Sequence, residues 1–567
     1  MMTHNIFRSA LIPPPAIPEQ YAQRYREEGL WIDQTLPEFF VEQCQRHAES
    51  LAVVGHSHTS WEEKTPPTIR WTYAELSQHG WDIASRLRAG GVRPGDRVLL
   101  QLPNIAEYMS ALLGIFYAGA LPVFCMPSHR ERELSHFARK TDAAAHIFSS
   151  RVPGMDLSAV YSSYSQMLRD EGRIPPLGYD VCHPWELEEQ EHLQELTTVM
   201  NTSAQRKSEQ VAFLQLSGGT TGVSKLIPRT HADYLYSVRE SAKICQLRSD
   251  STFLVVLPAS HNFTMSSAGI LGAMYVGATI VFAADPSPQT AFSLIAQENV
   301  KVAALVPPLV QAWIASAQRR TPDLSSLELL QVGGAKLSRS VAQNIKPVLG
   351  ATLQQVFGMA EGLVNYTRAE DSDELRYNTQ GKPISAFDEI LIVDDHDNPV
   401  PVGVSGHLLT RGPYTIRGYY DEPAINEKSF TEDGFYRSGD IVKLHPDGSL
   451  EVTGRAKDQI NRNGEKIAVD EIEDLALSHP KIYDAIALGI PDKTVGERVC
   501  LVVVPYPGEH FEANAREELQ HFFTEQGLAS YKIPERVEVM RSLPTTKVGK
   551  ISRKDVRAQL LETLSYS

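Results

Sequence analysis

Short apolar strands alternate with amphipathic helices along the first part of the chain. We predict strands at Arg70–Tyr73, Asp96–Gln101 and Leu121–Cys125, with helices at Ala74–Ala89 and Ala106–Gly119 between them. Apolar strands separated by helices are typical of βαβ units, which build mostly parallel sheets with helices on their faces. The alternation returns at Phe253–Leu257, Thr279–Phe282, Val302–Val306 and Leu329–Val332. The body of the chain is therefore predicted to be α/β.

The pattern changes near Glu389–Val393, where strands follow one another through turns rich in Gly, Pro and Asp. Such turns favour an antiparallel or barrel-like β piece. A candidate boundary lies at Gly454–Asp458. Beyond it we predict helices at Val469–Ser478, Ala515–Gln526 and Arg553–Thr563 and strands at Ile482–Leu488 and Arg498–Val504. We therefore expect an N-terminal core at 1–456 and a small α+β domain at 457–567. Two hydrophilic stretches, His56–Thr68 and Glu186–Glu209, are predicted loops.

Composition excludes several classes of protein. The chain has 567 residues, and its 69 acidic residues outnumber its 54 Lys and Arg residues, for a formal net charge of −15. Binding to phosphate backbones needs a basic face, so we expect no nucleic-acid partner. Five scattered cysteines argue against a disulfide framework and indicate a reducing compartment. We find no secretory signal and no apolar run long enough for a bilayer, so we expect a cytoplasmic protein without a membrane partner.

Glycines, hydroxyl groups and a lysine gather where one apolar strand ends. The segment Leu216–Lys225, LSGGTTGVSK, follows the predicted strand Val211–Leu216. Glycines let backbone N–H groups turn toward an anion, and hydroxyl groups and a lysine complete such a site. The segment is not a Walker A loop, because Val223 and Ser224 stand where that motif has Gly and Lys. We interpret it as a phosphate-binding loop, with a flexible surface turn as the alternative.

Two further strands end in segments that suit a nucleotide. Gln331–Leu337, QVGGAKL, has paired glycines, for which an ordinary strand–turn is an equal alternative. Gln355–Gly362, QVFGMAEG, brings an aromatic ring and a carboxylate close together. Phe357 could stack on a base, and Glu361 could hold Mg²⁺. The alternative for Glu361 is a solvated glutamate at a helix start.

Three later segments add charge. Asp440, in the turn Tyr436–Asp440, could bind a ribose diol, although such residues more often belong to an Asx turn. Gly454–Lys466, GRAKDQINRNGEK, could be a hinge or a polar hairpin. Leu543–Lys554, LPTTKVGKISRK, carries Lys550 on a Gly-containing turn. A lysine in such a tail is usually solvated, so Lys550 matters only if the small domain folds over the phosphate loop.

These six segments, in this order, resemble the adenylate-forming superfamily, which includes acyl- and aryl-CoA ligases, firefly luciferase and the adenylation domains of nonribosomal peptide synthetases. The resemblance covers the chain from near Leu30 to near Leu560. It implies a large N-terminal core, a small mobile C-terminal domain, and ATP and Mg²⁺ as cofactors. The order of six motifs is far more specific than any one of them.

The resemblance assigns the nucleotide site residue by residue. Catalytic roles fall to Lys550, which would reach the α-phosphate and the substrate carboxylate, and to Glu361, which would bind Mg²⁺. Lys457 falls at the hinge, and Ala360 stands where the superfamily usually has Thr, so a hydroxyl contact to phosphate is in doubt. The residues assigned to ATP are Ser217, Gly218, Gly219, Thr220, Thr221, Gly222, Lys225, Gly334, Ala335, Val356, Phe357, Asp440 and Arg455.

The segment Leu257–Gly269, LPASHNFTMSSAG, points to the substrate class. Members that activate amino acids have an Asp near Asn262 for the ammonium group, and an uncharged amide suits a neutral ortho-hydroxyl instead. His261 and Asn262 followed by an aromatic residue resemble the stand-alone aryl-acid AMP ligases of siderophore biosynthesis. The resemblance implies a substrate site formed by His261, Asn262, Phe263, Ser267, Gly333, Val356 and Val364.

Two positions separate the substrates within that group. Ser267 and Val364 resemble enzymes for 2,3-dihydroxybenzoate, whereas salicylate enzymes tend toward Cys and Leu there. A Ser can hydrogen-bond the 3-hydroxyl and Val leaves room for it, so we prefer 2,3-dihydroxybenzoate, with a salicylate-AMP ligase as the alternative. Ser267 could instead be an ordinary small interior residue.

The thiol acceptor is inferred from the resemblance. Only 17 residues follow Lys550, and no phosphopantetheine site is visible among them. We therefore expect a separate aryl carrier protein to supply the phosphopantetheine thiol, with Gly464 lining the pantetheine tunnel. An aryl-CoA ligase that uses free coenzyme A is an alternative. A degenerate homologue that only binds nucleotide is another, and the presence of Lys550, Glu361 and Asp440 argues against it.

Overall fold

The computed structural model describes most of the chain. The described residues are 8–57, 68–152, 155–183, 207–217, 224–462, 465–492, 494–511, 514–545 and 551–565. For residues 562–565 only the backbone is described. Most of the two predicted hydrophilic loops, His56–Thr68 and Glu186–Glu209, lies outside these ranges.

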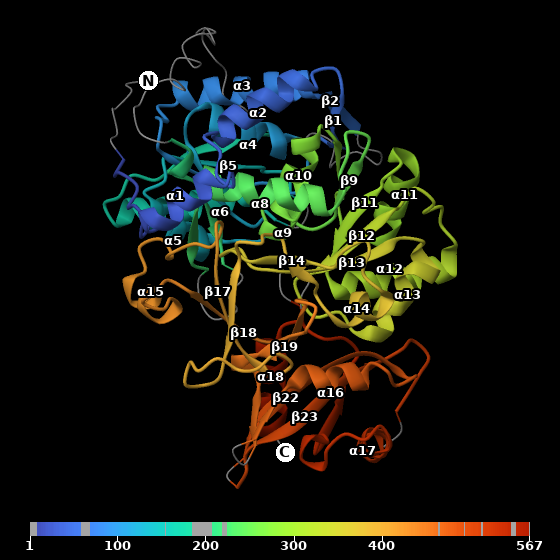
Figure 1. The fold of residues 1–567 in the computed structure, drawn as a ribbon. Coiled ribbons are helices and arrows are strands. Elements are labelled where there is room, and N and C mark those ends of the chain that lie inside the picture. The colour runs from blue at the N-terminus through green and yellow to red at the C-terminus, as the bar shows by residue number, and fades with distance from the viewer. Residues whose placement is uncertain are drawn as a thin grey trace.

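A nine-stranded sheet forms one half of the body (Figure 1). Its strands run in the order β15 (Lys382–Pro383), β14 (Val364–Tyr366), β13 (Thr352–Gly358), β12 (Leu329–Gly333), β11 (Val302–Leu305), β9 (Thr252–Val255), β10 (Thr279–Phe282), β1 (Leu51–His56) and β2 (Thr68–Thr72). Strands from β13 to β1 pair in parallel, and β2, β14 and β15 pair antiparallel. The predicted mostly parallel sheet is confirmed.

A second, six-stranded sheet lies beside it in the body. Its order is β6 (Leu177–Asp180), β5 (Ala145–Phe148), β3 (Arg97–Gln101), β4 (Leu121–Phe124), β7 (Val211–Leu216) and β8 (Leu226–Thr230). All neighbours are parallel except β7 and β8, which form a hairpin across the predicted phosphate loop. The loop is therefore anchored at both ends by paired strands.

Helices form three layers around the two sheets. Between the sheets pack α2 (Leu36–Arg46), α3 (Tyr73–Ala89), α4 (Glu107–Tyr117), α8 (His231–Ile244) and α10 (Gly269–Val276). On the outer faces lie α11 (Pro288–Glu298), α12 (Pro307–Arg320) and α13 (Arg339–Leu349) for the larger sheet, and α5 (Glu131–Thr141) and α6 (Leu157–Asp170) for the smaller. Strand β9 shows this layering in its side chains. Phe253 and Val255 belong to the apolar cluster between the sheets, and Leu254 belongs to the cluster under the outer helices of the larger sheet. Both faces of the sheets are thus buried, as parallel sheets require.

The described part of the body contains four further helices. They are α1 (Glu19–Glu27), α9 (Asn262–Ser266), α14 (Asp373–Asn378) and α15 (Pro423–Ser429). The predicted change of pattern near residue 389 corresponds to an antiparallel sheet of β16 (Glu389–Val393), β17 (Ser405–Arg411), β18 (Tyr436–Leu444) and β19 (Leu450–Arg455).

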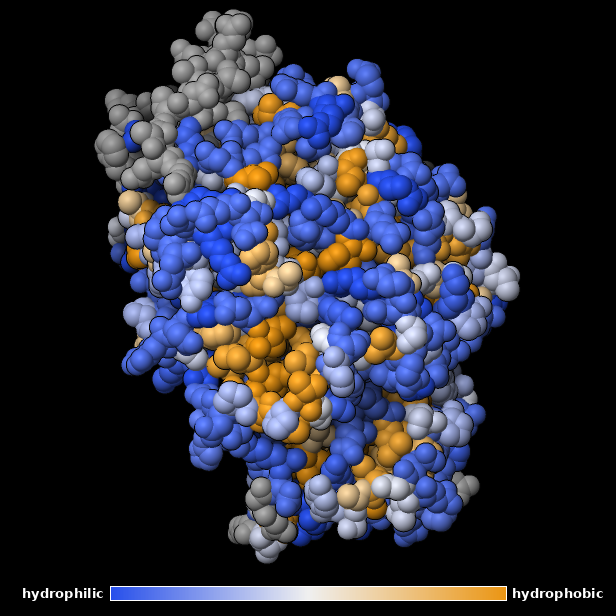
Figure 2. All heavy atoms as spheres, viewed as in Figure 1, coloured by the Kyte–Doolittle hydropathy of each residue, from blue (hydrophilic) through white to orange (hydrophobic). Residues whose placement is uncertain are grey.

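The residues after β19 form a separate small α+β unit with its own apolar clusters. Its elements are β20 (Ile460–Arg462), β21 (Glu465–Ile467), α16 (Val469–Ala476), β22 (Ile482–Asp492), β23 (Gly496–Pro505), α17 (Ala515–Glu525), β24 (Arg536–Val539) and α18 (Arg553–Ser565). Among the described residues, two ion pairs connect it to the body, Lys336–Asp474 at 2.8 Å and Lys466–Asp395 at 2.6 Å. On the face in Figure 2, apolar residues gather near the junction of the unit with the body, within a mostly hydrophilic surface.

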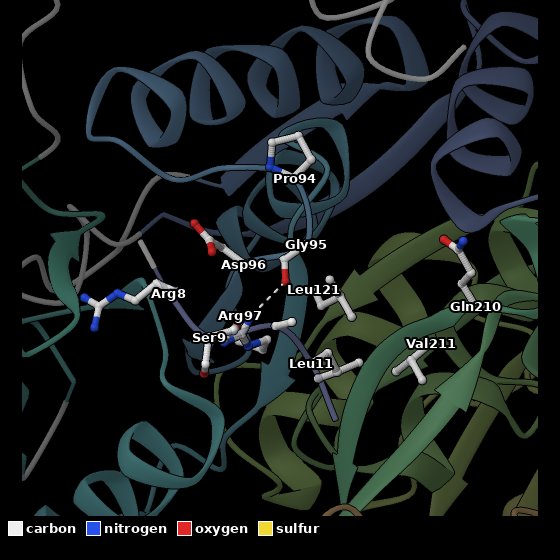
Figure 3. A pocket seen from close by; sticks show the side chains of 11 residues that line it. Arg8, Ser9, Leu11, Pro94, Gly95, Asp96, Arg97, Leu121, Gln210 and Val211 are labelled. Carbon is white, nitrogen blue, oxygen red and sulfur yellow. Dashed lines mark hydrogen bonds between the residues drawn. The ribbon is translucent and has the colours of Figure 1, made fainter. Parts of the chain in front are cut away.

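The start of the described chain is fastened to the body by a buried arginine. In β3, Arg97 donates hydrogen bonds to the carbonyl oxygens of Thr141, Gly95 and Ser9 at 2.7, 2.9 and 2.8 Å. A cavity of about 400 Å³ lies here, between residues 8–11, the 94–97 turn and the start of β7 (Figure 3). Its lining includes the start of β7, and the predicted phosphate loop follows the other end of that strand. Among the described helices, none is both long and apolar enough to cross a membrane.

Candidate active site

The two ends of the predicted phosphate loop are tied together. Ser217 N–H donates to the carbonyl of Lys225 at 2.9 Å, and Lys225 N–H donates to Ser217 Oγ at 3.0 Å. These bonds extend the β7–β8 hairpin by one step and fix the points where the loop leaves the sheet. The predicted loop residues Gly218, Gly219, Thr220, Thr221 and Gly222 lie outside the described residues.

Opposite charges lie on either side of one tyrosine ring beside the loop. Lys225 Nζ sits 3.9 Å from the centre of the Tyr419 ring, and the Tyr419 hydroxyl donates to Glu361 Oε1 at 2.8 Å. Burial lowers the pKa of Lys225; the nearby carboxylates of Glu361 and Glu422 act in the opposite direction, and Lys457 adds to the lowering. The Glu361 side chain is buried. The predicted metal ligand, phosphate lysine and hinge lysine are therefore close neighbours.

The predicted ribose-binding pair is formed. Asp440 on β18 and Arg455 on β19 are cross-strand partners, and Arg455 Nε lies 2.8 Å from Asp440 Oδ1. Asp440 is 3% exposed, and burial raises the pKa of its carboxyl, which the Arg455 charge partly opposes. A buried carboxylate next to an arginine has acceptor oxygens held in place, as binding of a diol requires.

An apolar wall is built on one face of the larger sheet. Val356 on β13 pairs with Gly333 on one side and with Tyr366 on the other, and Val364 lies opposite Gly358. Paired residues share a sheet face, and so do residues two apart. All five positions therefore face the same side.

The wall depends on glycine at position 333, because any larger residue would place a side chain where other atoms already lie. A Cβ there would lie 2.8 Å from the Val356 carbonyl oxygen and 3.1 Å from Phe263 Cζ. The Phe263 ring thus reaches the sheet over a glycine, and Phe263, Val356 and Val364 belong to one buried apolar cluster. The structure brings together four predicted substrate residues from three strands and α9.

Polar groups border this wall. Helix α9 begins at Asn262, and the His261 ring accepts a hydrogen bond from Phe263 N–H at 3.2 Å, which caps that helix. Ser267 follows the helix and is buried. Burial raises the pKa of the Tyr366 hydroxyl well above its usual value, and the nearby Ser241 and Ser267 hydroxyls partly oppose this. Among the described residues, neither the Tyr366 nor the Ser241 hydroxyl has a partner at ordinary hydrogen-bond distance and angle.

Other predicted residues lie elsewhere. Phe357 alternates with Val356 and lies on the opposite face of β13, where its ring packs against the cluster of the antiparallel sheet. Gly334 and Ala335 are exposed at the end of β12. Lys550 and Gly464 lie outside the described residues.

The sequence did not single out Arg229, which connects these parts. Its side chain is 2% exposed, and its Nε donates to Asp233 Oδ1 at 3.0 Å. Nη1 donates to the carbonyl of Ala360 at 2.8 Å, and Nη2 to that of Tyr414 at 3.2 Å. Ala360 precedes Glu361, so one buried cation joins β8, α8 and the loop that carries the predicted metal ligand. Its only sequence signal is a charge within an apolar strand.

Comparison with known proteins agrees with this geometry. A model of the AMP-binding enzyme family matches residues 40–420, and a model of the AMP-binding enzyme C-terminal domain matches residues 471–550. The chain is 46% identical to a 2,3-dihydroxybenzoate-AMP ligase of Bacillus subtilis (strain 168), over 96% of this chain and 97% of the relative. It is 42% identical to a salicylyl-CoA synthase / salicylate adenylyltransferase of a Streptomyces species, over 95% and 96%. A solved structure, the apo form of MbtA from Mycobacterium smegmatis, is 41% identical with a TM-score of 0.69, over 97% of this chain and 99% of that one.

The buried ion pair predicts a large loss of stability on mutation. Replacing Arg229 with Met leaves Asp233 buried without its cation and two carbonyls without donors, so we expect Arg229→Met to lower the free energy of unfolding by about 3–5 kcal/mol. The matched control is Arg437→Met, since Arg437 forms an exposed pair with Asp397 and should contribute no more than about 1 kcal/mol. Urea unfolding followed by circular dichroism measures both. Equal shifts for the two variants would contradict the structural role of Arg229.

Proposed function

Because the chain belongs to the AMP-binding enzyme family, we propose that it activates 2,3-dihydroxybenzoate with ATP and passes the acyl group to a carrier protein. The enzyme is a ligase. The proposed product of the first step is the aryl-adenylate. The proposed acceptor is the phosphopantetheine thiol of a separate aryl carrier protein in siderophore biosynthesis.

The observation that carries this proposal is an uncharged amide beside an apolar wall. Asn262 lies at the start of α9, whose Phe263 packs over Gly333 against Val356. A flat ring suits a wall made of a glycine, a valine and a phenylalanine, and an amide without charge suits a phenolic acid better than an amino acid. An amino-acid substrate would need a carboxylate at the amide position to bind its ammonium group.

Hydroxyl groups near the wall support the choice of a dihydroxylated ring. Ser267, Tyr366 and Ser241 bring three buried hydroxyls together, and among the described residues two of them have no partner at ordinary hydrogen-bond distance and angle. Buried polar groups are rarely left unpaired, so this cluster suits a ligand hydroxyl. A site that hydrogen-bonds a hydroxyl rejects a ligand without it, and this favours 2,3-dihydroxybenzoate over salicylate.

The residues at Glu361 fit a magnesium ion. Tyr419 donates to Glu361 Oε1, and no described residue donates to Oε2. Among the described residues, no group of three or more His, Cys, Asp or Glu could form a dedicated metal cage. Mg²⁺ is usually held by one or two carboxylates together with substrate phosphates and water, which matches a single buried carboxylate beside a phosphate loop. When bound, Mg²⁺ neutralises charge on the phosphates.

In the proposed first step, an oxygen of the aryl carboxylate attacks the α-phosphorus of ATP. The bond between the α- and β-phosphates breaks, and pyrophosphate leaves with its electron pair. Two anions must approach each other, so cations near the phosphates lower the barrier. Lys225 would hold the leaving pyrophosphate at the base of the loop, Lys550 would bind the α-phosphate, and Asp440 would orient the ribose. We propose that Val356 and Phe357 border the adenine with Gly334 and Ala335.

In the proposed second step, the thiolate sulfur of phosphopantetheine attacks the acyl carbon and AMP leaves. We propose that the unit at 457–567 rotates about Lys457 between the steps, so that different faces meet the body. Such a rotation must break the Lys336–Asp474 and Lys466–Asp395 pairs, which connect the unit to the body in this structure. Gly464 would then line the pantetheine path.

The proposal predicts a step-specific defect at Lys550. Lys550→Ala removes one charge contact to the α-phosphate in the transition state, so adenylate formation should fall by about 10²–10³-fold. Thiolation of preformed aryl-adenylate should stay close to the wild-type rate. ATP–pyrophosphate exchange measures the first step, and transfer from synthetic adenylate to a carrier protein measures the second. Equal loss in both steps would refute the assigned role.

The hydroxyl cluster predicts a change in substrate preference. Ser267→Ala removes one hydroxyl and should reduce the preference for 2,3-dihydroxybenzoate over salicylate by about 10-fold, the value of one hydrogen bond to a buried ligand hydroxyl. Salicylate activation itself should change little. ATP–pyrophosphate exchange with both acids gives the ratio of kcat/KM. A wild-type enzyme that prefers salicylate would overturn the proposed substrate, and faster transfer to free coenzyme A than to a carrier protein would overturn the proposed acceptor.

A further inference from the structure

The hydroxyl of Tyr234 fixes the orientation of the Asn262 side-chain amide. Tyr234 lies on α8, and its O–H donates to Asn262 Oδ1 at 2.9 Å. A primary amide carries an acceptor oxygen at one end and a donor nitrogen at the other. In this structure the phenol hydroxyl donates to the oxygen end, whereas a flipped amide would require the same hydroxyl to give up that bond and accept from the amide nitrogen instead. The oxygen end of Asn262 is therefore bound toward α8.

The nitrogen end of the same amide has no partner in the described part of the protein. No described residue accepts a hydrogen bond from Asn262 Nδ2. Asn262 is half-buried, whereas the next residue, Phe263, is buried over Gly333 in the apolar wall. The free end of the amide is thus a hydrogen-bond donor at the edge of the proposed aryl-acid site.

Tyr234 is itself held in place by two contacts of its ring. Its side chain is fully buried, and its ring and the Phe213 ring of β7 form a T-shaped pair with 4.6 Å between ring centres. The Arg229 guanidinium lies over the Tyr234 ring, 4.8 Å from its centre. A buried aromatic ring that contacts another ring and a cation loses little further freedom when its hydroxyl forms a hydrogen bond. The orientation of Asn262 is therefore imposed by the core of the body.

We propose that Tyr234 is a positioning residue that makes Asn262 a hydrogen-bond donor to the ortho substituent of the substrate. This inference rests on the proposed function and adds a rule of specificity to it. The ortho-hydroxyl of a 2-hydroxybenzoate donates its proton to its own carboxylate, so it presents lone pairs outward. The ortho-amino group of 2-aminobenzoate uses one N–H in the same way and presents the other N–H outward. The outward N–H of the amino group would face the N–H of Asn262, and two donors repel each other. The site therefore selects a hydroxyl over an amino group at the ortho position of the ring.

The same helix provides a matched control. Tyr236 is buried two residues after Tyr234, and its hydroxyl forms a hydrogen bond with Ser385 Oγ at 2.7 Å. Tyr236→Phe therefore removes another buried phenol hydroxyl of α8 without touching Asn262. Tyr234→Phe removes only the hydroxyl that orients the amide and keeps the ring contacts with Phe213 and Arg229.

The test is ATP–pyrophosphate exchange by the full-length variants with 2,3-dihydroxybenzoate and 2-aminobenzoate. For Tyr234→Phe we expect the KM for 2,3-dihydroxybenzoate to rise about 10-fold, the effect of one hydrogen bond to a buried polar group, while the KM for ATP stays within about 2-fold. The preference for the hydroxy acid over the amino acid should narrow by a similar factor, because the freed amide can turn its oxygen toward an amine. Tyr236→Phe should keep the wild-type values.

Several outcomes would overturn the inference. Unchanged KM and preference in Tyr234→Phe would do so, and so would a parallel rise of the KM for ATP and for the acid, or the same change in Tyr236→Phe. A wild-type enzyme that activates neither acid would instead refute the proposed function, so the two failures are distinguishable.

A second variant keeps the inference testable if Tyr234→Phe does not fold. Asn262→Asp has the same shape but offers no N–H, so it should lose 2,3-dihydroxybenzoate activation and gain relative preference for 2-aminobenzoate. An unchanged preference in Asn262→Asp would contradict the donor role of the amide. In the double variant, Tyr234→Phe should add no further loss, because both changes remove the same interaction.

Discussion

The geometry of the site depends on one buried guanidinium. Arg229 donates from three nitrogens to Asp233, to the carbonyl of Ala360 and to the carbonyl of Tyr414, which belong to three separate segments. Arg229, Asp233 and Tyr414 have almost no exposed surface, so an unpaired group there could not turn to water and would carry the full desolvation penalty. The loop that carries Glu361 therefore holds a fixed position relative to α8. A reaction between two bound substrates needs binding groups with fixed relative positions, since a displacement of the reacting atoms by about 1 Å lowers the rate strongly.

Helix α8 also holds the other end of the site in place, through Tyr234. The Tyr234 ring packs against Arg229, and its hydroxyl binds Asn262. The loop that carries Glu361 and the side-chain amide of Asn262 are thus bound to two residues, Arg229 and Tyr234, that contact each other. The wall at Gly333 is rigid for a different reason, because the backbone of β13 and the ring of Phe263 already occupy the space of a side chain.

Much of the fold and part of the site could be predicted from the sequence because local patterns determine them. Apolar runs indicated the strands, and glycines and charges at strand ends marked the segments where Ser217 and Glu361 lie. Asp440 was predicted in a turn but lies within β18, so that prediction is wrong. Arg229 and Tyr234 were missed because Ala360 and Tyr414, which Arg229 binds, and Asn262, which Tyr234 binds, belong to distant segments that no local pattern reveals. The opposite faces of Val356 and Phe357 follow from strand alternation, but which face meets the apolar wall is decided by the pairing of β12, β13 and β14. The adenine contact of Phe357 stays a prediction.

Tyr419 explains how two opposite charges can stay available for a nucleotide. Lys225 lies against the face of its ring and Glu361 accepts from its hydroxyl, and among the described residues neither charge forms an ion pair. A direct Lys225–Glu361 pair would satisfy both groups and would have to break before either met phosphate or metal. The ring contact stabilises the cation by a smaller amount than an ion pair in the same buried place would, and the phenol leaves the second carboxylate oxygen unbound. Separating the two charges by an aromatic ring thus keeps the site organised before a nucleotide arrives, because little must be undone when it binds.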